Sequence, residues 1–197
     1  MGEISTVTPC FTPGTHITTD RGQVPVETLR PGIKVATRDN GLRRIYWIGQ
    51  RVVPYAELLD VPSLCPIIVR AGALGGGRPF RDMVVSPTHR FLVPKAFGDA
   101  MTGEAEPLVA AHLLTSLPGI SYASCLGVSY LHILCDQHQV LLADGAWAES
   151  FHPDDQILGA MAAAQRREIL ELFPDVATIG AARRFPAARA VVDREGV

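Results

Sequence analysis

The residue best suited to covalent chemistry is Cys10, in the segment Pro9-Cys10-Phe11-Thr12-Pro13-Gly14-Thr15. A thiol can attack the carbonyl of the preceding residue and convert that peptide bond into a thioester. Because this shift is unfavourable in an unstrained peptide, a fold must twist the bond, protonate the departing nitrogen and stabilise the oxyanion. The Pro9-Cys10 bond is therefore the candidate scissile bond. A buried core thiol is the alternative interpretation of Cys10.

These requirements direct attention to the segment Ser86-Pro87-Thr88-His89, at a predicted junction between a strand and a turn. A histidine beside the scissile bond can protonate the amide nitrogen, and a hydroxyl group can bind the carbonyl or orient the ring. A single histidine is more often structural than catalytic. His89, Ser86 and Thr88 thus become candidates only if the fold brings them to Cys10.

Further candidates lie near the end of the longest apolar run. Of His132 and His138 we expect His138 to face the site, with Asp136 as its charge partner. Glu149 is expected to be a solvated surface carboxylate. Structural roles are expected for the remaining histidines and for the two tryptophans, which are His16, His112, His152, Trp47 and Trp147.

Composition limits the function further. The chain has 197 residues, 47% of them hydrophobic, which is enough for one main domain with a sizeable core. A net charge of −2 with interspersed signs disfavours nucleic acid as a partner. No CxxC pair suggests zinc, so no metal or cofactor is expected. With no apparent signal peptide or membrane span, we expect a cytoplasmic protein or one secreted by a signal-peptide-independent route.

The elements that must position these residues are mainly short strands. Alternating segments predict strands at 16–19, 24–26, 34–37, 43–53, 64–70, 82–85, 90–93 and 128–143. Asn40-Gly41 is a hairpin signal, because both residues tolerate positive φ angles. One helical turn is expected near 109–114. Asp154 to Phe173 has helical spacing of apolar residues and acidic residues at its start, which predicts a helix. The Ala/Arg-rich tail after Asp175 either packs on the domain or frays.

Several segments, in order, resemble the bacterial branch of the Hint family, which unites the Hedgehog autoprocessing domain with inteins. They are Cys10 to Thr15, Val26-Glu27-Thr28-Leu29-Arg30-Pro31-Gly32, Thr37 to Gly41, Ile45 to Gly49, Ser86 to His89 and Tyr130 to Phe151. Ser86 to His89 resembles the family's Thr-x-x-His element, with Ser86 in the place of the Thr. The resemblance spans residues 10 to 151.

The resemblance implies an all-β, pseudo-symmetric, horseshoe-like fold with a short C-terminal helix. It divides the chain into an N-terminal flank (1–9), a Hint domain (10–151) and a C-terminal helical extension (152–197). It also implies an N-to-S acyl shift at Cys10 assisted by His89, with Ser86 as the hydroxyl partner. The substrate would be the chain's own N-terminal flank, cut once per molecule.

Outcomes differ within the family after the thioester forms. Splicing requires a terminal Asn and a following Cys, Ser or Thr, but these places hold Ser150 and Phe151. The expectation is therefore cleavage by water or by an external thiol or amine, without splicing. Two alternatives remain open: a degenerate, non-cleaving Hint fold that serves as a protein-interaction module, and a Cys-His hydrolase acting on other molecules.

Overall fold

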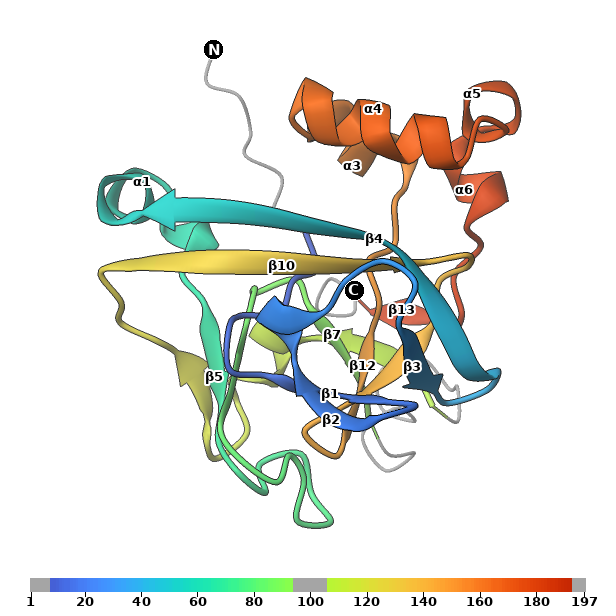
Figure 1. Cartoon of the computed structure of the whole chain (residues 1–197). Coiled ribbons are helices and arrows are strands. Elements are labelled where there is room, and N and C mark those ends of the chain that lie inside the picture. Colours follow the sequence, from blue (N-terminus) through green and yellow to red (C-terminus); the bar gives the residue numbers. More distant parts are fainter. Residues whose placement is uncertain (1–7, 94–105, 193–197) are drawn as a thin grey trace.

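The computed structural model describes residues 8–93 and 106–192. Two β-sheets form the larger share of its regular secondary structure (Figure 1). The predicted all-β class is confirmed. Residues 1–7 of the predicted N-terminal flank and the end of the tail lie outside the described residues.

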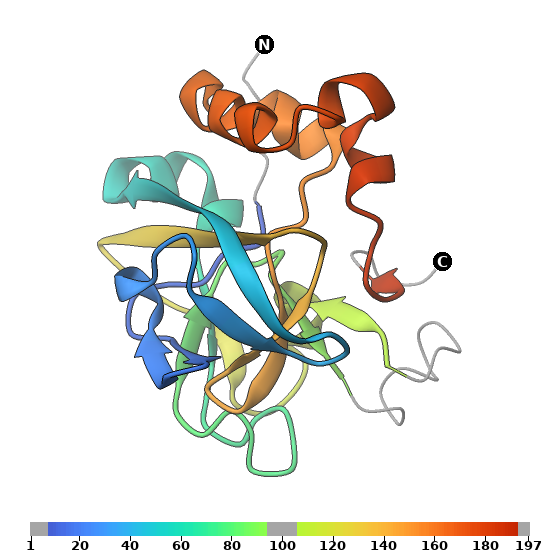
Figure 2. The same cartoon turned by 45° about the vertical axis from the view of Figure 1, so that its right-hand side comes forward.

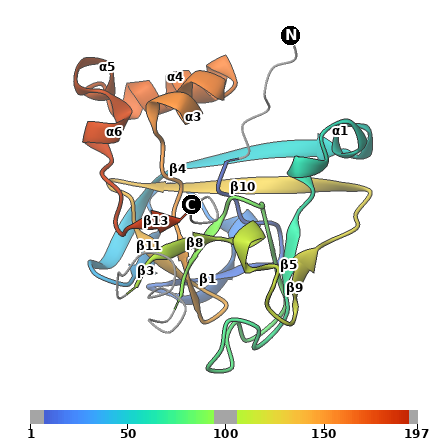
Figure 3. The same cartoon turned by 180° about the vertical axis from the view of Figure 1, so that it is seen from behind.

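The larger sheet has ten strands, ordered β10-β4-β3-β1-β11-β12-β7-β8-β13, with β2 paired to β1. Its strands are β1 (His16–Thr19), β2 (Gly22–Pro25), β3 (Lys34–Thr37), β4 (Gly41–Pro54), β7 (Arg90–Leu92), β8 (Leu108–Ala110), β10 (Gly127–Cys135), β11 (Val140–Ala143), β12 (Ala146–Glu149) and β13 (Val191–Val192). The smaller sheet pairs β5 (Ile67–Val69) with β6 (Met83–Val85) and β9 (Ile120–Tyr122), and lies below one end of β10 (Figure 3). The short helices of this region are η1 (Val26–Thr28), α1 (Tyr55–Asp60), η2 (Pro62–Leu64) and η3 (Ala111–Leu114).

Tight turns at glycine pairs shape the sheet. β3 and β4 form the hairpin predicted at Asn40-Gly41, where Gly41 has a φ of 64°. The 128–143 run forms two strands, β10 and β11, because the chain turns between Cys135 and Val140. The Asp144-Gly145 pair then closes the β11–β12 hairpin with positive φ at both residues, as a two-residue type I′ turn requires.

The β4–β10 pair is the longest antiparallel ladder and is covered on both faces. Leu131 and Ile133 of β10 belong to the main core between the sheets. Their neighbours Tyr130, His132 and Leu134 point to the other face, since strand side chains alternate. Cys10 and the C-terminal helices pack on that second face. The helices lie above the ladder in Figures 1 and 2.

The C-terminal segment differs from the single predicted helix. It forms α3 (Asp155–Ala160), α4 (Ala163–Leu172), α5 (Val176–Ile179) and α6 (Ala181–Arg184). The predicted helix is interrupted because Met161 adopts an extended backbone conformation, with ψ of 155°. Asp154 caps α3 by accepting from the Ile157 N–H at 2.6 Å, in line with the predicted acidic start.

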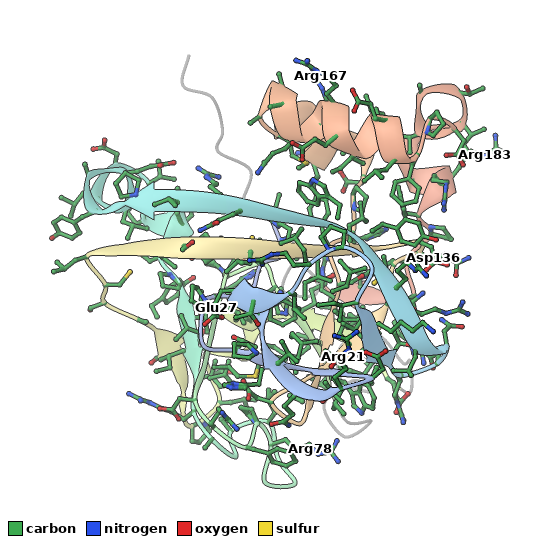
Figure 4. The ribbon with its side chains drawn as sticks, viewed as in Figure 1. Arg21, Glu27, Arg78, Asp136, Arg167 and Arg183 are labelled. Carbon is green, nitrogen blue, oxygen red and sulfur yellow. The ribbon has the colours of Figure 1, made fainter. Side chains whose placement is uncertain are left out.

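The tail packs on the domain instead of fraying. Its apolar side chains meet the β4–β10 ladder in one cluster, here named the tail core, which comprises Trp47, Leu134, Phe151, Ile157, Leu158, Ile169, Phe173, Val176, Ala181 and Phe185. Arg167, in contrast, points outward from α4 (Figure 4). The chain then returns to the main sheet, where β13 runs parallel to β8.

We predict that Phe185→Ala lowers the free energy of unfolding by about 3–5 kcal/mol, because this fully buried ring fills the tail core against Phe173, 5.1 Å away between ring centroids. Urea unfolding followed by tryptophan fluorescence measures the loss. Ile179→Ala, at a side chain that is 41% exposed, is the matched control. An unchanged urea midpoint for Phe185→Ala would show that the tail does not stabilise the domain.

Candidate active site

The backbone around Cys10 is fixed between the two sheets. Phe11 exchanges two backbone hydrogen bonds with Leu131 of β10, at 2.9 and 2.8 Å, and forms an isolated bridge to Val85 of β6. The Cys10 carbonyl accepts from the Ser86 N–H at 3.1 Å. Strand β10 and the end of β6 thus hold the candidate scissile bond in the interior, where Pro9 is buried and Cys10 is 2% exposed.

Ser86 contacts the scissile bond directly. The Cys10 N–H donates to Ser86 Oγ at 2.9 Å, and that hydroxyl donates to the Thr8 carbonyl at 2.8 Å. Ser86 is fully buried, so its bond to the Cys10 nitrogen is shielded from water. The residue predicted as the hydroxyl partner therefore lies at the nitrogen that an acyl shift would release.

The thiol of Cys10 is protonated in the resting state. Its Sγ donates to the Thr8 carbonyl at 2.9 Å, and the Thr8 hydroxyl lies 3.5 Å away. Burial raises the pKa of Cys10 to about 12, although hydrogen bonds to Thr8 and Ser86 and the charge of Arg51 act in the opposite direction. A nearby base must remove the proton before the sulfur can attack.

His132 is the histidine that faces Cys10. Its Nδ1 lies 3.3 Å from Sγ and 3.2 Å from the Pro9 carbonyl oxygen, and its Nε2 lies 3.6 Å from Sγ. A carbonyl oxygen only accepts, so the Pro9 contact puts the proton on Nδ1 and leaves Nε2 bare. Burial lowers the pKa of His132 to about 4, which keeps the ring neutral at physiological pH.

The prediction that His138 faces the site is therefore wrong. His132 belongs to β10, whereas His138 lies beyond the end of that strand, after the chain has turned. Asp136 is also not the charge partner of His138, which pairs with Glu149. The backbone carbonyl of Asp136 accepts from Arg184 at 2.8 Å, and its side chain lies at the periphery near the end of β10 (Figure 4).

His138 belongs instead to a second buried cluster around Glu149. Its Nδ1 accepts from the Ala188 N–H at 3.1 Å, which places its proton on Nε2, 3.3 Å from Glu149 Oε2. Its ring stacks on His152 with centroids 4.2 Å apart. The cluster therefore joins strand β12 to the C-terminal tail.

Glu149 is fully buried, so the expectation of a solvated surface carboxylate is wrong. It accepts from the Arg90 N–H at 2.8 Å and from the Arg90 guanidinium at 2.7 Å. Burial alone would raise the pKa of Glu149, but His138 and Arg90 outweigh it and hold the pKa below its ordinary value. The sequence carried no signal for this pairing, because Arg90 lies 59 residues away and only the β7–β12 ladder joins them.

His89 supports the site through its backbone. Its N–H donates to the Ser86 carbonyl at 3.0 Å, which closes the turn carrying Ser86. The ring packs edge-on against Phe11, 4.4 Å between centroids, and within the described residues neither ring nitrogen has a hydrogen-bond partner. Burial lowers the pKa of His89 to about 4. Thr88 is half-buried in the same turn. The proton-donor role of His89 stays a prediction.

The arrangement suits acyl transfer at the Pro9-Cys10 bond. The neutral imidazole of His132 contacts the thiol sulfur and the carbonyl oxygen, and the Ser86 hydroxyl contacts the nitrogen that would react. The part of the chain that the structure describes brings no three His, Cys, Asp or Glu side chains into a metal-binding group. In the same residues, no helix is long and apolar enough to cross a membrane.

The Hint domain family model matches residues 9–155, about three quarters of the chain. The chain therefore belongs to the Hint domain family, and the resemblance read from the sequence is confirmed. The Hint fold implies a capacity for autoprocessing in general.

Solved structures with similar folds include two bacterial domains. The bacterial intein-like domain from Clostridium thermocellum is 15% identical, with a TM-score of 0.44, covering 72% of this chain and 97% of that one. A DnaB intein from Synechocystis sp. is 10% identical, with a TM-score of 0.46, covering 72% of this chain and 98% of that one. No curated protein matches the sequence.

We predict that Cys10 and Cys135 react far more slowly with a thiol reagent than Cys65 and Cys125. Burial raises the pKa of both Cys10 and Cys135 to about 12 and shields their sulfurs, whereas Cys65 and Cys125 are half-buried. Ellman's reagent at about pH 8 followed by peptide mass mapping assigns the rates. Labelling of Cys10 as fast as Cys125 would contradict the closed site.

A second prediction concerns stability below neutral pH. The pKa values of His89 and His132 fall from 6.5 to about 4 on folding, so the unfolded chain binds more protons between those values. The free energy of unfolding should fall as pH drops through this window, by up to about 1.4 kcal/mol per pH unit for each ring. Urea titrations across the window measure the slope. His132→Gln should make the slope of the free energy of unfolding against pH shallower. An unchanged slope would show that folding does not lower the pKa of His132.

Proposed function

We propose that this domain cleaves its own chain at the Pro9-Cys10 bond through a thioester on Cys10. The carrying observation is that His132 Nε2 lies 3.6 Å from Sγ and its Nδ1 lies 3.2 Å from the Pro9 oxygen, while Ser86 Oγ lies 2.9 Å from the Cys10 nitrogen. Each reacting atom of the bond thus has a buried partner.

In the first step, Sγ attacks the Pro9 carbonyl carbon while His132 Nε2 takes the thiol proton. The carbonyl electron pair moves to oxygen, and the Nδ1–H of His132 stabilises that oxyanion. Collapse of the intermediate breaks the bond to the Cys10 nitrogen. That nitrogen takes up the proton from His132, whose ring returns to its neutral form, while the Ser86 hydroxyl holds the nitrogen through the N–H···Oγ hydrogen bond.

The second step releases the N-terminal flank. Water attacks the thioester carbonyl, giving a flank that ends in a Pro9 carboxylate and a domain that begins with a free Cys10 amine and thiol. An external thiol or amine in place of water gives a thioester or an amide. The reaction occurs once per chain, because its substrate is the chain itself.

Splicing does not fit the C-terminal end of the match. Asn40 is the only asparagine in the sequence, and its side chain donates to Gln139 beside the β3–β4 hairpin. Ser150 and Phe151 occupy the C-terminal junction, so no asparagine can cyclise there. Phe151 is buried and its N–H donates to the Ile133 carbonyl at 2.7 Å, which anchors this residue against β10.

The second candidate is a Hint fold that no longer cleaves. The observation in its favour is the resting thiol, which donates to the Thr8 carbonyl and has its pKa raised by burial to about 12. In this case the domain serves as a protein-interaction module.

A reporter fused ahead of Met1 separates the two. Wild type incubated with dithiothreitol should release a reporter fragment ending at Pro9, identified by intact mass, and Cys10→Ala should release none. His132→Ala should slow release at least about 100-fold, because the base and the oxyanion donor are lost together. His16→Ala is the matched control on the half-exposed His16.

The same assay decides the role of His89. His89→Ala should slow release as strongly as His132→Ala if His89 donates the proton, and much less if it only closes the turn at Ser86. Wild type that stays whole over days at several pH values would overturn the cleavage proposal and favour the non-cleaving module.

A further inference from the structure

We infer that Trp47 is a positioning residue for His132 and that helix α4 fixes Trp47 through Glu168. This inference rests on the proposed function, because it explains how the C-terminal segment controls the reacting histidine. It gives helix α4 a positioning role in the reaction.

Gly49 creates the space that Trp47 occupies. The β4–β10 register places Gly49 directly opposite His132, with Trp47 two residues earlier on the same face. A Cβ at Gly49 would overlap the indole, at 2.6 and 2.7 Å from its Cζ3 and Cζ2. The indole therefore lies flat over Gly49 beside the imidazole, a placement that any side chain at position 49 would block.

The indole and Phe151 enclose the imidazole. Trp47 stacks on His132 with an interplanar angle of 16° and centroids 6.2 Å apart, and Phe151 packs against the same ring at 4.9 Å. These contacts restrict rotation of the His132 ring while its nitrogens face Cys10 Sγ and the Pro9 oxygen. They also exclude water, which is the cause of the lowered pKa of His132.

Helix α4 holds the indole from outside. The Trp47 Nε1–H donates to Glu168 Oε2 at 2.6 Å, and Gln165 one turn earlier donates to the Gln50 carbonyl at 3.0 Å. Glu168 is exposed, so the folded core does not otherwise require a carboxylate at this position. The same helix buries Ile169 in the tail core, which fixes its distance from β4.

Two variants test the inference, each in the reporter fusion. Gly49→Ala should displace the indole and slow release roughly 10- to 100-fold, since small misplacements of reacting groups have effects of this size. Glu168→Leu should slow release in the same direction by a smaller factor. Glu168→Gln keeps an acceptor for the indole and should restore the wild-type rate. Glu171→Leu makes the same change at an exposed site on the same helix and is the matched control.

The decisive readout is the titration of His132, followed by NMR of its imidazole in a Cys10→Ala background, where no cleavage occurs. Gly49→Ala and Glu168→Leu should raise its pKa toward 6.5, because the ring gains water. A wild-type titration curve in both variants would overturn the inference, as would rate losses that Glu171→Leu shares. Failure of the wild type to cleave would count against the proposed function, while the titration would still decide the role of Trp47.

Discussion

The paired hydrogen bonds between Phe11 and Leu131 are the constraint on which the site depends. They hold Phe11, the residue after Cys10, against β10, so Cys10 lies on the covered face of the β4–β10 ladder. His132 is one residue beyond Leu131 and points to that face. Ser86 reaches the bond from the other side because it follows directly on β6, to which Phe11 also bridges.

Burial of this site has opposing effects on its two central groups. It raises the pKa of the Cys10 thiol and lowers that of His132, so both are neutral at rest. A neutral imidazole with its proton on Nδ1 can act toward the carbonyl oxygen and the sulfur at once. The Glu149 cluster lies apart from this chemistry. Glu149 pairs with Arg90 and His138, and His138 accepts from the Ala188 N–H of the tail, so the cluster joins β12 to the tail.

Much of the fold followed from local signals. The Asn40-Gly41 and Asp144-Gly145 turns and the short alternating strands are encoded by neighbouring residues, and so is the cap at Asp154. The helix break at Met161 carried no comparable signal, because the apolar spacing continues across it.

The site was predictable where a motif fixed it and unpredictable where only the folded chain brought residues together. Cys10 and Ser86 were found from their motifs, and they meet at the scissile bond. His132 was passed over for His138 because the sequence did not show that β10 ends at Cys135. The buried state of Glu149 depends on Arg90 from a distant strand, and the covering of His132 by Trp47 depends on Gly49 and α4.

The most direct test follows the scissile bond itself. Pro9-Cys10 is the only Pro-Cys junction in the sequence, so protein labelled with ¹³C at proline carbonyls and ¹⁵N at cysteines contains one directly bonded labelled pair. Thiol addition should abolish the one-bond correlation of that pair in the wild type, with a new uncoupled carbonyl signal, and leave it intact in His132→Ala. A correlation that persists at full intensity in the folded wild type would contradict acyl transfer at Cys10.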